Sequence, residues 1–355
     1  MKKRIVYFDY LRTAAILSVI VLHTAAKHWN DFGGRSFSWN VLNFYDGITR
    51  WGVPVFVMIS GALFLSREID LRTLYKKNIL RLASAYFAWA AFYALAEPLV
   101  RAVQTGTFEI SLRSVMSGII TGQTHMWFIP MIAGLYMCVP ILRQMVRSET
   151  VTRYYLLLSF VFACVVPQIT VMSGDFVGGW FAAGIGRINQ VISGSMDLRP
   201  VLGYSFYFVL GYRINSVEFT KKQRRIIYLL GAVGFVSTVL LNAVVAWKTG
   251  VPCQTYYGNF RINVLLEAVS VHTWFRYREY RSIRLSRIVP LLAKYSFGAY
   301  LIHIFVLNLL SIFGVNALMC SPVVSVPAVS LLTAVISFAV SCVIHRIPVI
   351  RQWIV

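Results

Sequence analysis

The sequence predicts an all-α membrane protein with about ten transmembrane helices and with both termini in the cytoplasm. Only 13% of its 355 residues are charged and 58% are hydrophobic, whereas a soluble domain carries roughly 25% charged residues. Apolar runs of about 20 residues, the length that crosses a bilayer, recur along the chain. The net charge is +21, but the basic residues gather in short clusters between these runs. That pattern is typical of cytoplasmic loops and argues against binding to nucleic acid.

The expected elements follow in order from the apolar runs and their polar flanks. We place the spans at residues 10–28, 45–65, 82–100, 124–142, 153–172, 200–214, 226–247, 259–275, 288–312 and 322–345. The first run holds Arg12 and His23 and has no convincing cleavage site, so we interpret it as a retained span and not a signal peptide. Segment 110–122 is expected to form a short interfacial helix. The glycine-rich outer loop 173–199 could fold back as a lid or re-entrant segment.

The distribution of basic residues sets the expected orientation. Clusters recur on alternate flanks of the spans, around residues 2–4, 67–81, 143–153, 213–225, 276–287 and 346–351. Because positive flanks face the cytoplasm, both termini are expected there. We expect a single membrane domain over residues 1–355 and no soluble domain. The five cysteines lack metal-ligand spacing, so neither a metal site nor a disulfide framework is predicted.

Two ionisable side chains, Arg12 and His23, interrupt the first apolar run. Eleven residues of α-helix make three turns and about 20°, so both lie on one face and roughly 16 Å apart along the axis. Asp9 lies near the same face and could pair with Arg12. Ionisable residues inside a membrane usually serve a function. The alternative is that Arg12 extends to the cytoplasm while His23 hydrogen-bonds a neighbouring helix.

Four segments of the sequence contain motifs that occur in a characteristic order. They are DYLRTAAILSVIVLH at 9–23, RWGVPVFVMISGALFL at 50–65, HMWFIPMIAGLYMCVPILR at 125–143 and YSFGAYLIHIF at 295–305. In this order they resemble the motifs of the acyltransferase family 3 membrane proteins, and the resemblance covers nearly the whole chain. It is closest to the stand-alone branch that O-acetylates enterobacterial common antigen. One departure is that KKNILRLASAYFAW at 76–89 lacks a proline that the family often has, so the start of the third span could differ.

The resemblance implies a multi-pass enzyme of the bacterial inner membrane that transfers an acyl group from cytoplasmic acyl-CoA, here acetyl-CoA. The acceptor would be a hydroxyl of an envelope glycan or lipid-linked sugar. His23 would be the catalytic histidine, because imidazole can accept the proton of an attacking hydroxyl. Arg12 would be its partner in the motif, because a cation can hold a phosphate of CoA. The residues expected to bind the donor are Arg12, Lys76, Lys77 and Arg81. The implied partners are membrane lipids, acyl-CoA and the glycan, with no metal and no nucleic acid, and a homo-oligomer is compatible with the sequence.

Other polar residues in the spans are candidates for binding the acceptor. Ser296, Tyr300 and His303 follow one another at i, i+4 and i+7 on one face of the ninth span, where they could line a cavity or hydrogen-bond between helices. His125 and Trp127 begin the fourth span at the outer interface. There His125 could bind the acceptor, and Trp127 also suits an anchor in the membrane interface.

Two charged residues, Arg50 and Glu267, are assigned supporting roles. Glu267 lies six residues after Arg261 in the expected eighth span, so a structural ion pair explains it as well as a site does.

Two other functions suit a basic-inside membrane protein with buried charge. One is a transporter or flippase of a small molecule or lipid-linked sugar. The other is the membrane domain of a membrane-bound serine racemase, which would be joined to a soluble racemase domain. Neither requires an arginine and a histidine at this spacing, so the sequence favours acyl transfer.

Overall fold

The computed structural model describes residues 5–108, 110–196, 198 and 203–348. Within these residues every regular element is a helix and no strand occurs. The expectation of an all-α membrane fold is therefore confirmed. Some expectations lie outside the described residues: those on the two chain ends, on 200–202 of the sixth span, and on Lys2, Lys3, Arg4, Arg199 and Arg351.

The described residues form two compact units, each built from segments that are distant in sequence. The first unit contains residues 5–22, Trp29–Glu68 and the described part of Val139–Tyr280. The second contains His23–His28, the described part of Ile69–Cys138 and residues 281–348. Helix α1 (Val6–Ala26) begins in the first unit and ends in the second.

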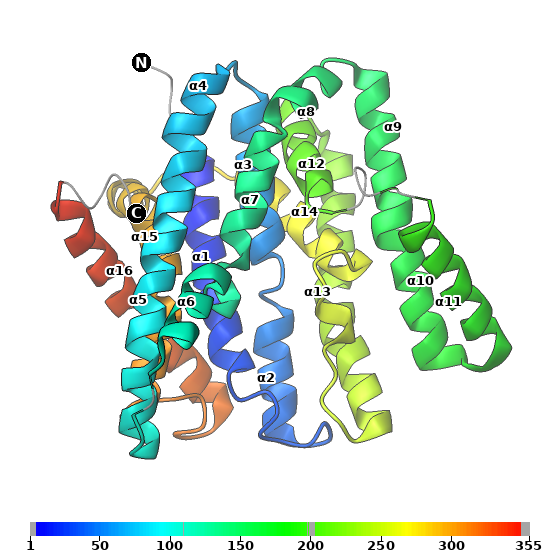
Figure 1. Ribbon diagram of the computed structural model, residues 1–355. Coiled ribbons are helices and arrows are strands. Elements are labelled where there is room, and N and C mark those ends of the chain that lie inside the picture. Colours follow the sequence, from blue (N-terminus) through cyan, green and yellow to red (C-terminus); the bar gives the residue numbers. More distant parts are fainter. Residues whose placement is uncertain (1–4, 109, 197, 199–202, 349–355) are drawn as a thin grey trace. The chain divides into compact units, whose positions relative to one another are not determined.

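The first unit is built around two closely packed helix pairs. After α1 its helices are α2 (Phe37–Gly47), α3 (Gly52–Leu65), α8 (Val139–Met145), α9 (Glu149–Ser159), η3 (Phe160–Val165), α10 (Val166–Met172), η4 (Ser173–Val177), α11 (Gly179–Gly194), α12 (Ser205–Ser216), α13 (Lys221–Thr249), η5 (Thr255–Tyr257) and α14 (Ile262–Tyr277). Helix α3 packs against α12, and α13 packs against α14 (Figure 1). Helix α14 also contacts α3, so the two pairs share one core.

The second unit contains the long helix α5 and the last two helices of the chain (Figure 1). Its helices are α4 (Leu71–Thr73), the π-helix η1 (Leu74–Ile79), α5 (Leu80–Thr105), α6 (Leu112–Thr121), the 3₁₀ helix η2 (Thr124–Trp127), α7 (Phe128–Met137), α15 (Ile283–Ile312) and α16 (Pro322–Arg346). Helix α15 packs against α16, and α5 contacts α6, α7 and α15. Trp89, Met126 and Leu301 are buried in one apolar core. Their burial holds α5, η2 and α15 together.

Local sequence signals set the ends of these helices. Helix α13 begins after Thr220, whose side chain accepts a hydrogen bond from the backbone N–H of Gln223 in a capping box. The helix is capped at its end by Gly250, which has φ 76°. Helix α6 begins after Ser111 in the same kind of box, with Ser114 as its partner. Helix α5 ends at Gly106 with φ 72°, a conformation that glycine adopts without steric cost.

Seven helical stretches of the described residues are long and apolar enough to cross a membrane, and an eighth is a pair bent by 56°. They are Val6–Ala26, Phe37–Leu65, Leu71–Val103, Glu149–Val177, Lys221–Thr249, Ile283–Ile312, Pro322–Arg346 and the bent pair Thr124–Met137 with Val139–Met145. The other two expected spans coincide with α12 and α14, of 12 and 16 residues. Both helices are shorter than the roughly 20 residues that cross the hydrocarbon core, so seven or eight stretches of the described residues meet this measure, and residues 200–202 of the expected sixth span lie outside the described residues.

Three local expectations can be compared with the structure. Segment 110–122 contains a helix, α6, as expected. The expected loop 173–199 is mostly helical, because η4 and α11 fill it and α11 packs back against α10. The segment at 76–89 that lacks the family proline begins in the π-helix η1 and continues into α5, and whether this start differs from that of the family stays a prediction.

The close crossing of α3 and α12 yields a stability prediction. A Cβ atom at Gly61 would lie 1.8 Å from the carbonyl oxygen of Phe208, and one at Gly211 would lie 2.1 Å from that of Met58. Small residues permit such an approach between membrane helices. Because backbone must move to relieve the clash, we expect Gly61→Ala to lower the free energy of unfolding by about 1–3 kcal/mol. Thermal unfolding of the purified protein in detergent measures this loss.

The matched control is Gly134→Ala in α7, where an added Cβ meets no atom within 4 Å. Alanine favours a helix more than glycine does, so this variant should be as stable as the parent or slightly more stable. Equal unfolding temperatures for the two variants would show that α3 and α12 do not depend on their close approach.

Candidate functional site

Three histidine side chains from three helices come together in the second unit. His23 comes from the end of α1, His125 from η2 and His303 from the middle of α15. The ring centroid of His303 is 5.2 Å from that of His23 and 5.2 Å from that of His125. We call these three residues the histidine cluster. It joins residues that are up to 280 positions apart in the sequence.

His303 is fully buried and is held in one tautomer by its own helix. Its Nδ1 lies 2.5 Å from the carbonyl oxygen of Tyr300. A carbonyl oxygen can only accept, so Nδ1 carries the hydrogen and, in the neutral ring, Nε2 is the bare nitrogen. This Nε2 is buried and has no hydrogen-bond partner among the described residues. It is therefore available to a ligand that offers a hydroxyl or an amide hydrogen.

His125 is also buried, and aromatic rings surround it. Tyr93 and Tyr300 each place a ring edge-on, with centroids 5.5 Å from the imidazole. The hydroxyl of Tyr300 donates to the carbonyl oxygen of His125, which ties α15 to η2. Neither ring nitrogen of His125 has a hydrogen-bond partner among the described residues. Buried polar atoms without a partner are uncommon, and a polar ligand is one explanation for them.

His23 differs from the other two histidines because it remains partly exposed. One turn later, Nζ of Lys27 donates to Oδ1 of Asn308 at 2.9 Å and to the carbonyl oxygen of Leu307 at 3.3 Å. These bonds fix the end of α1 against α15 and keep His23 beside His303. The cluster therefore offers one partly accessible imidazole next to two buried ones.

The other expected acceptor residues occupy different positions. Tyr300 lies beside the histidine cluster, and its ring centroid is 5.9 Å from that of His303. Ser296 is buried, and its hydroxyl donates to the carbonyl oxygen of Ala293 in the same helix. Trp127 is 41% exposed and lies edge-on to Phe128, which suits the alternative of an interfacial anchor. The structure thus groups His23, His125, Tyr300 and His303, whereas Ser296 bonds within its own helix and Trp127 is exposed beside Phe128.

Tyr93 is a member of the site that sequence reasoning missed. Its hydroxyl donates to the carbonyl oxygen of Leu301 at 2.8 Å, and its ring contacts His125. It lies among many aromatic residues of α5, so nothing in its neighbourhood distinguishes it. The only signal in the sequence is a phenol in the middle of an apolar span, where a hydroxyl needs a partner.

The expected donor-binding residues lie on two elements. Arg12 is partly exposed on α1, which runs without a break from Arg12 to His23, as the spacing requires. Lys76 and Lys77 in η1 and Arg81 in α5 are exposed. Asp70 caps the start of α4, and the hydrogen bond from the backbone amide of Thr73 holds the pKa of Asp70 below its usual range.

Asp9 is buried, and its carbonyl oxygen accepts from Oγ1 of Thr13 at 2.9 Å. Its pairing with Arg12 stays a prediction. Among the described residues, no group of three histidine, cysteine or acidic side chains has the arrangement of a metal site.

The two charged residues with expected supporting roles lie in the first unit. Arg50 donates to the buried carboxylate of Asp46 at 2.6 Å, and its guanidinium lies 4.0 Å from the centroid of the Tyr257 ring. Arg50 therefore has a structural role that its sequence position alone does not reveal.

Glu267 is fully buried and accepts from the hydroxyl of Thr238. An ion pair with Arg261 was one of two explanations for Glu267, and the structure shows Arg261 donating instead to the carbonyl oxygens of Pro167 and Thr255 at 2.8 and 3.0 Å. Six residues of helix turn a side chain by about 240°, so the two charges do not share a face.

Comparison with known proteins identifies one family. The profile of the acyltransferase domain (Acyl_transf_3) matches residues 5–346, and so covers both compact units and all three members of the histidine cluster. No curated protein matches the chain. No solved structure matches it either.

Proposed function

The chain belongs to the acyltransferase 3 family, and we propose that it moves an acetyl group from cytoplasmic acetyl-CoA to a hydroxyl of an envelope glycan. The acceptor could be polymeric or lipid-linked, as in the branch that modifies enterobacterial common antigen, and the membrane would be the bacterial inner membrane. The observation that carries the proposal is the histidine cluster. A partly exposed imidazole beside two buried ones is suited to removing the proton of a sugar hydroxyl.

We assign the general base to His23. Of the three histidines it alone is partly exposed, and a base must lie within hydrogen-bond reach of the hydroxyl that it deprotonates. Among the described residues, Nε2 of His303 and both ring nitrogens of His125 have no hydrogen-bond partner. Nε2 of His303 and the bare nitrogen of His125 can therefore accept hydrogen bonds from other hydroxyls of the same sugar, and the N–H of His125 can donate one. In this arrangement His303 and His125 position the acceptor.

The reaction balances with these groups alone. His23 takes the proton as the hydroxyl oxygen attacks the thioester carbonyl carbon. The tetrahedral intermediate then expels the CoA thiolate, which receives that proton from the imidazolium. The products are an acetyl ester of the glycan and CoA with a free thiol. A covalent acyl-histidine is the alternative use of the same imidazole, and it also requires His23.

The basic residues suit the donor. Arg12 precedes His23 by eleven residues of unbroken helix, which is roughly 16 Å along the axis. A guanidinium forms two parallel hydrogen bonds with a phosphate, and this geometry suits CoA. With CoA held at Arg12, the slender pantetheine arm could run along α1 and present its thioester near His23. Lys76, Lys77 and Arg81 offer further exposed positive charge for the nucleotide.

Arg12→Gln is expected to weaken acetyl-CoA binding by about tenfold or more, the equivalent of one charge-assisted hydrogen bond. Arg12→Lys should restore only part of the affinity, because an ammonium lacks the planar fork. Equilibrium dialysis with labelled acetyl-CoA measures the dissociation constant, and unfolding temperatures show that the variants are folded. The control is Arg113→Gln on α6, an exposed arginine outside the proposed donor site. Unchanged binding in Arg12→Gln would make Arg12 a structural residue.

The function is tested with the purified protein, acetyl-CoA labelled in its acetyl group, and a panel of bacterial envelope glycans. We expect label in the glycan as an alkali-labile ester, with one free CoA thiol released for each acetyl group transferred. If the protein moves a lipid-linked sugar across vesicles without acetyl-CoA and acetylates none of the glycans, the transporter or flippase alternative is correct.

A further inference from the structure

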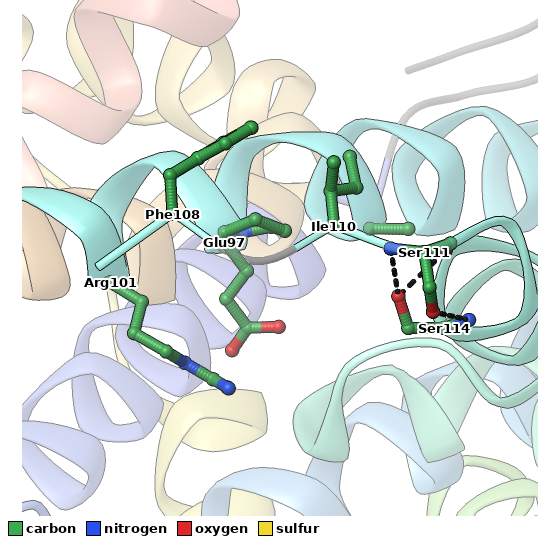
Figure 2. A pocket seen from close by; sticks show the side chains of 9 residues that line it. Glu97, Arg101, Phe108, Ile110, Ser111 and Ser114 are labelled. Carbon is green, nitrogen blue, oxygen red and sulfur yellow. Dashed lines mark hydrogen bonds between the residues drawn. The ribbon is translucent and has the colours of Figure 1, made fainter.

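A cavity of about 560 Å³ lies in the second unit between the C-terminal half of α5 and α6. Figure 2 shows six of the side chains that line it: Glu97, Arg101, Phe108, Ile110, Ser111 and Ser114. None of these residues has a place in the proposed chemistry. The volume is in the range of pockets that hold small organic ligands.

Two charged groups of this cavity have no hydrogen-bond or ion-pair partner among the described residues. Glu97 and Arg101 are four residues apart on α5 and extend to the same side of the helix (Figure 2). No hydrogen bond or ion pair joins either side-chain charge to another described residue. The cavity therefore presents a carboxylate that can accept hydrogen bonds and a guanidinium with five N–H donors.

The rest of the lining gives this cavity its shape and an apolar surface. The hydroxyls of Ser111 and Ser114 are committed to the capping box of α6 (Figure 2), so they hold the start of α6 in place. Phe108 is 55% exposed and contributes apolar area to the lining. A sugar has the matching chemistry, since its hydroxyls hydrogen-bond to both charged groups and its C–H faces pack on an aromatic ring.

Both walls of the cavity continue to the histidine cluster. On α5, Tyr93, Glu97 and Arg101 are spaced by four residues, so they follow one face of the helix at about 6 Å per step. Tyr93 contacts His125 directly. On the other side, α6 ends at Thr121 and the chain reaches His125 four residues later. Glu97 and Arg101 therefore lie one and two helical turns from Tyr93, the residue that contacts His125.

We propose that this cavity binds a sugar unit of the acceptor other than the one that is acetylated, through Glu97 and Arg101. The proposal rests on the acceptor being a glycan, as in the proposed function. The two charges are of opposite sign, so the described lining favours a neutral sugar. A uronic acid would be attracted by Arg101 but repelled by Glu97, and a free amino sugar the reverse, so neither ion gains from the pair as a whole. The cavity thereby selects acceptors that are at least two sugars long.

The first test measures binding without any reaction. Ligand-observed NMR of the protein is recorded with three neutral trisaccharides (N,N′,N″-triacetylchitotriose, maltotriose and mannotriose) and with anionic trigalacturonate. We expect at least one neutral trisaccharide to bind and trigalacturonate to bind more weakly. Glu97→Gln and Arg101→Gln should each raise the dissociation constant of the neutral trisaccharide by about tenfold. Arg113→Gln on α6, outside the cavity lining, should bind like the parent.

The second test uses the acetyl-transfer assay. Glu97→Gln should raise KM for the glycan by about tenfold and leave kcat and the dissociation constant of acetyl-CoA unchanged, because the cavity touches a sugar that does not react. A loss of kcat with unchanged KM in Glu97→Gln would overturn the proposal. It would also be overturned if Glu97→Gln weakened the binding of none of the neutral trisaccharides. If no glycan is acetylated while sugar binding still depends on Glu97, the proposed function fails and the sugar site stands.

Discussion

His23→Ala is expected to lower the turnover number for acetyl transfer by roughly 10²–10⁴-fold, the range that general-base assistance contributes. His23 is partly exposed at the end of α1 and its ring neighbours that of His303, so the substitution removes the base without opening the buried part of the site. Binding of acetyl-CoA should remain, because the phosphates are assigned to Arg12 and the basic residues. Initial rates with labelled acetyl-CoA and saturating glycan give the turnover number.

The matched control is His345→Ala. His345 lies in the same unit near the end of α16, where its Nδ1 contacts the carbonyl oxygen of Ser341 and its ring contacts Tyr295. It should retain turnover close to that of the parent. A well-folded His23→Ala protein with near-parental turnover would move the base to His303 or His125. Equal losses in both variants would indicate a general effect of removing a histidine.

Arg50→Met is expected to reduce the free energy of unfolding by about 3–5 kcal/mol, the usual cost of removing one partner of a buried ion pair. The carboxylate of Asp46 is only 1% exposed, and Arg50 is the cation that neutralises it. The long apolar side chain of methionine keeps much of the packing against Tyr257, so the loss reports mainly on the stranded charge. Chemical denaturation of the purified protein measures it.

Arg153→Met provides a control with the same spacing. Arg153 and Glu149 also form an i, i+4 pair, but their side chains are 70% and 49% exposed. An exposed pair contributes about 0–1 kcal/mol, so this variant should be nearly as stable as the parent. The double variant Asp46→Asn with Arg50→Met should recover part of the loss, because no charge is then left buried. If Arg50→Met and Arg153→Met lower the free energy of unfolding by the same amount, Asp46 is better solvated than its burial indicates.

The positions of the helices were predictable because an apolar run that crosses a membrane must form a helix. Backbone groups in hydrocarbon must bond within their own segment, so each run of about 20 apolar residues forms a helix. The same rule predicts spans at α12 and α14, but these helices have only 12 and 16 residues and are shorter than the hydrocarbon core is thick. It also misjudged 173–199, whose glycines suggested a loop although Trp180 and the apolar residues after it form α11.

The members of the site were predictable only in part. Tyr300 and His303 are neighbours on one helix, so their shared face follows from helical spacing. The meeting of His23, His125 and His303 involves three helices, and no spacing within the chain encodes it. The family resemblance singled out these histidines. Tyr93, Glu97 and Arg101 have no such marker, because their roles depend on which elements α5 packs against.

The acetyl group is expected to enter from the side of Arg12 and to leave at the histidine cluster, roughly 16 Å further along α1, which is about half of the hydrocarbon core. The most direct measurement uses the protein in sealed vesicles, with labelled acetyl-CoA inside and a membrane-impermeant acceptor glycan outside, compared with both reactants outside. In vesicles that hold the protein in both orientations, we expect labelled glycan when the reactants are on opposite sides and none when they share a side. Labelled glycan formed only when both reactants are on the same side would contradict the claim.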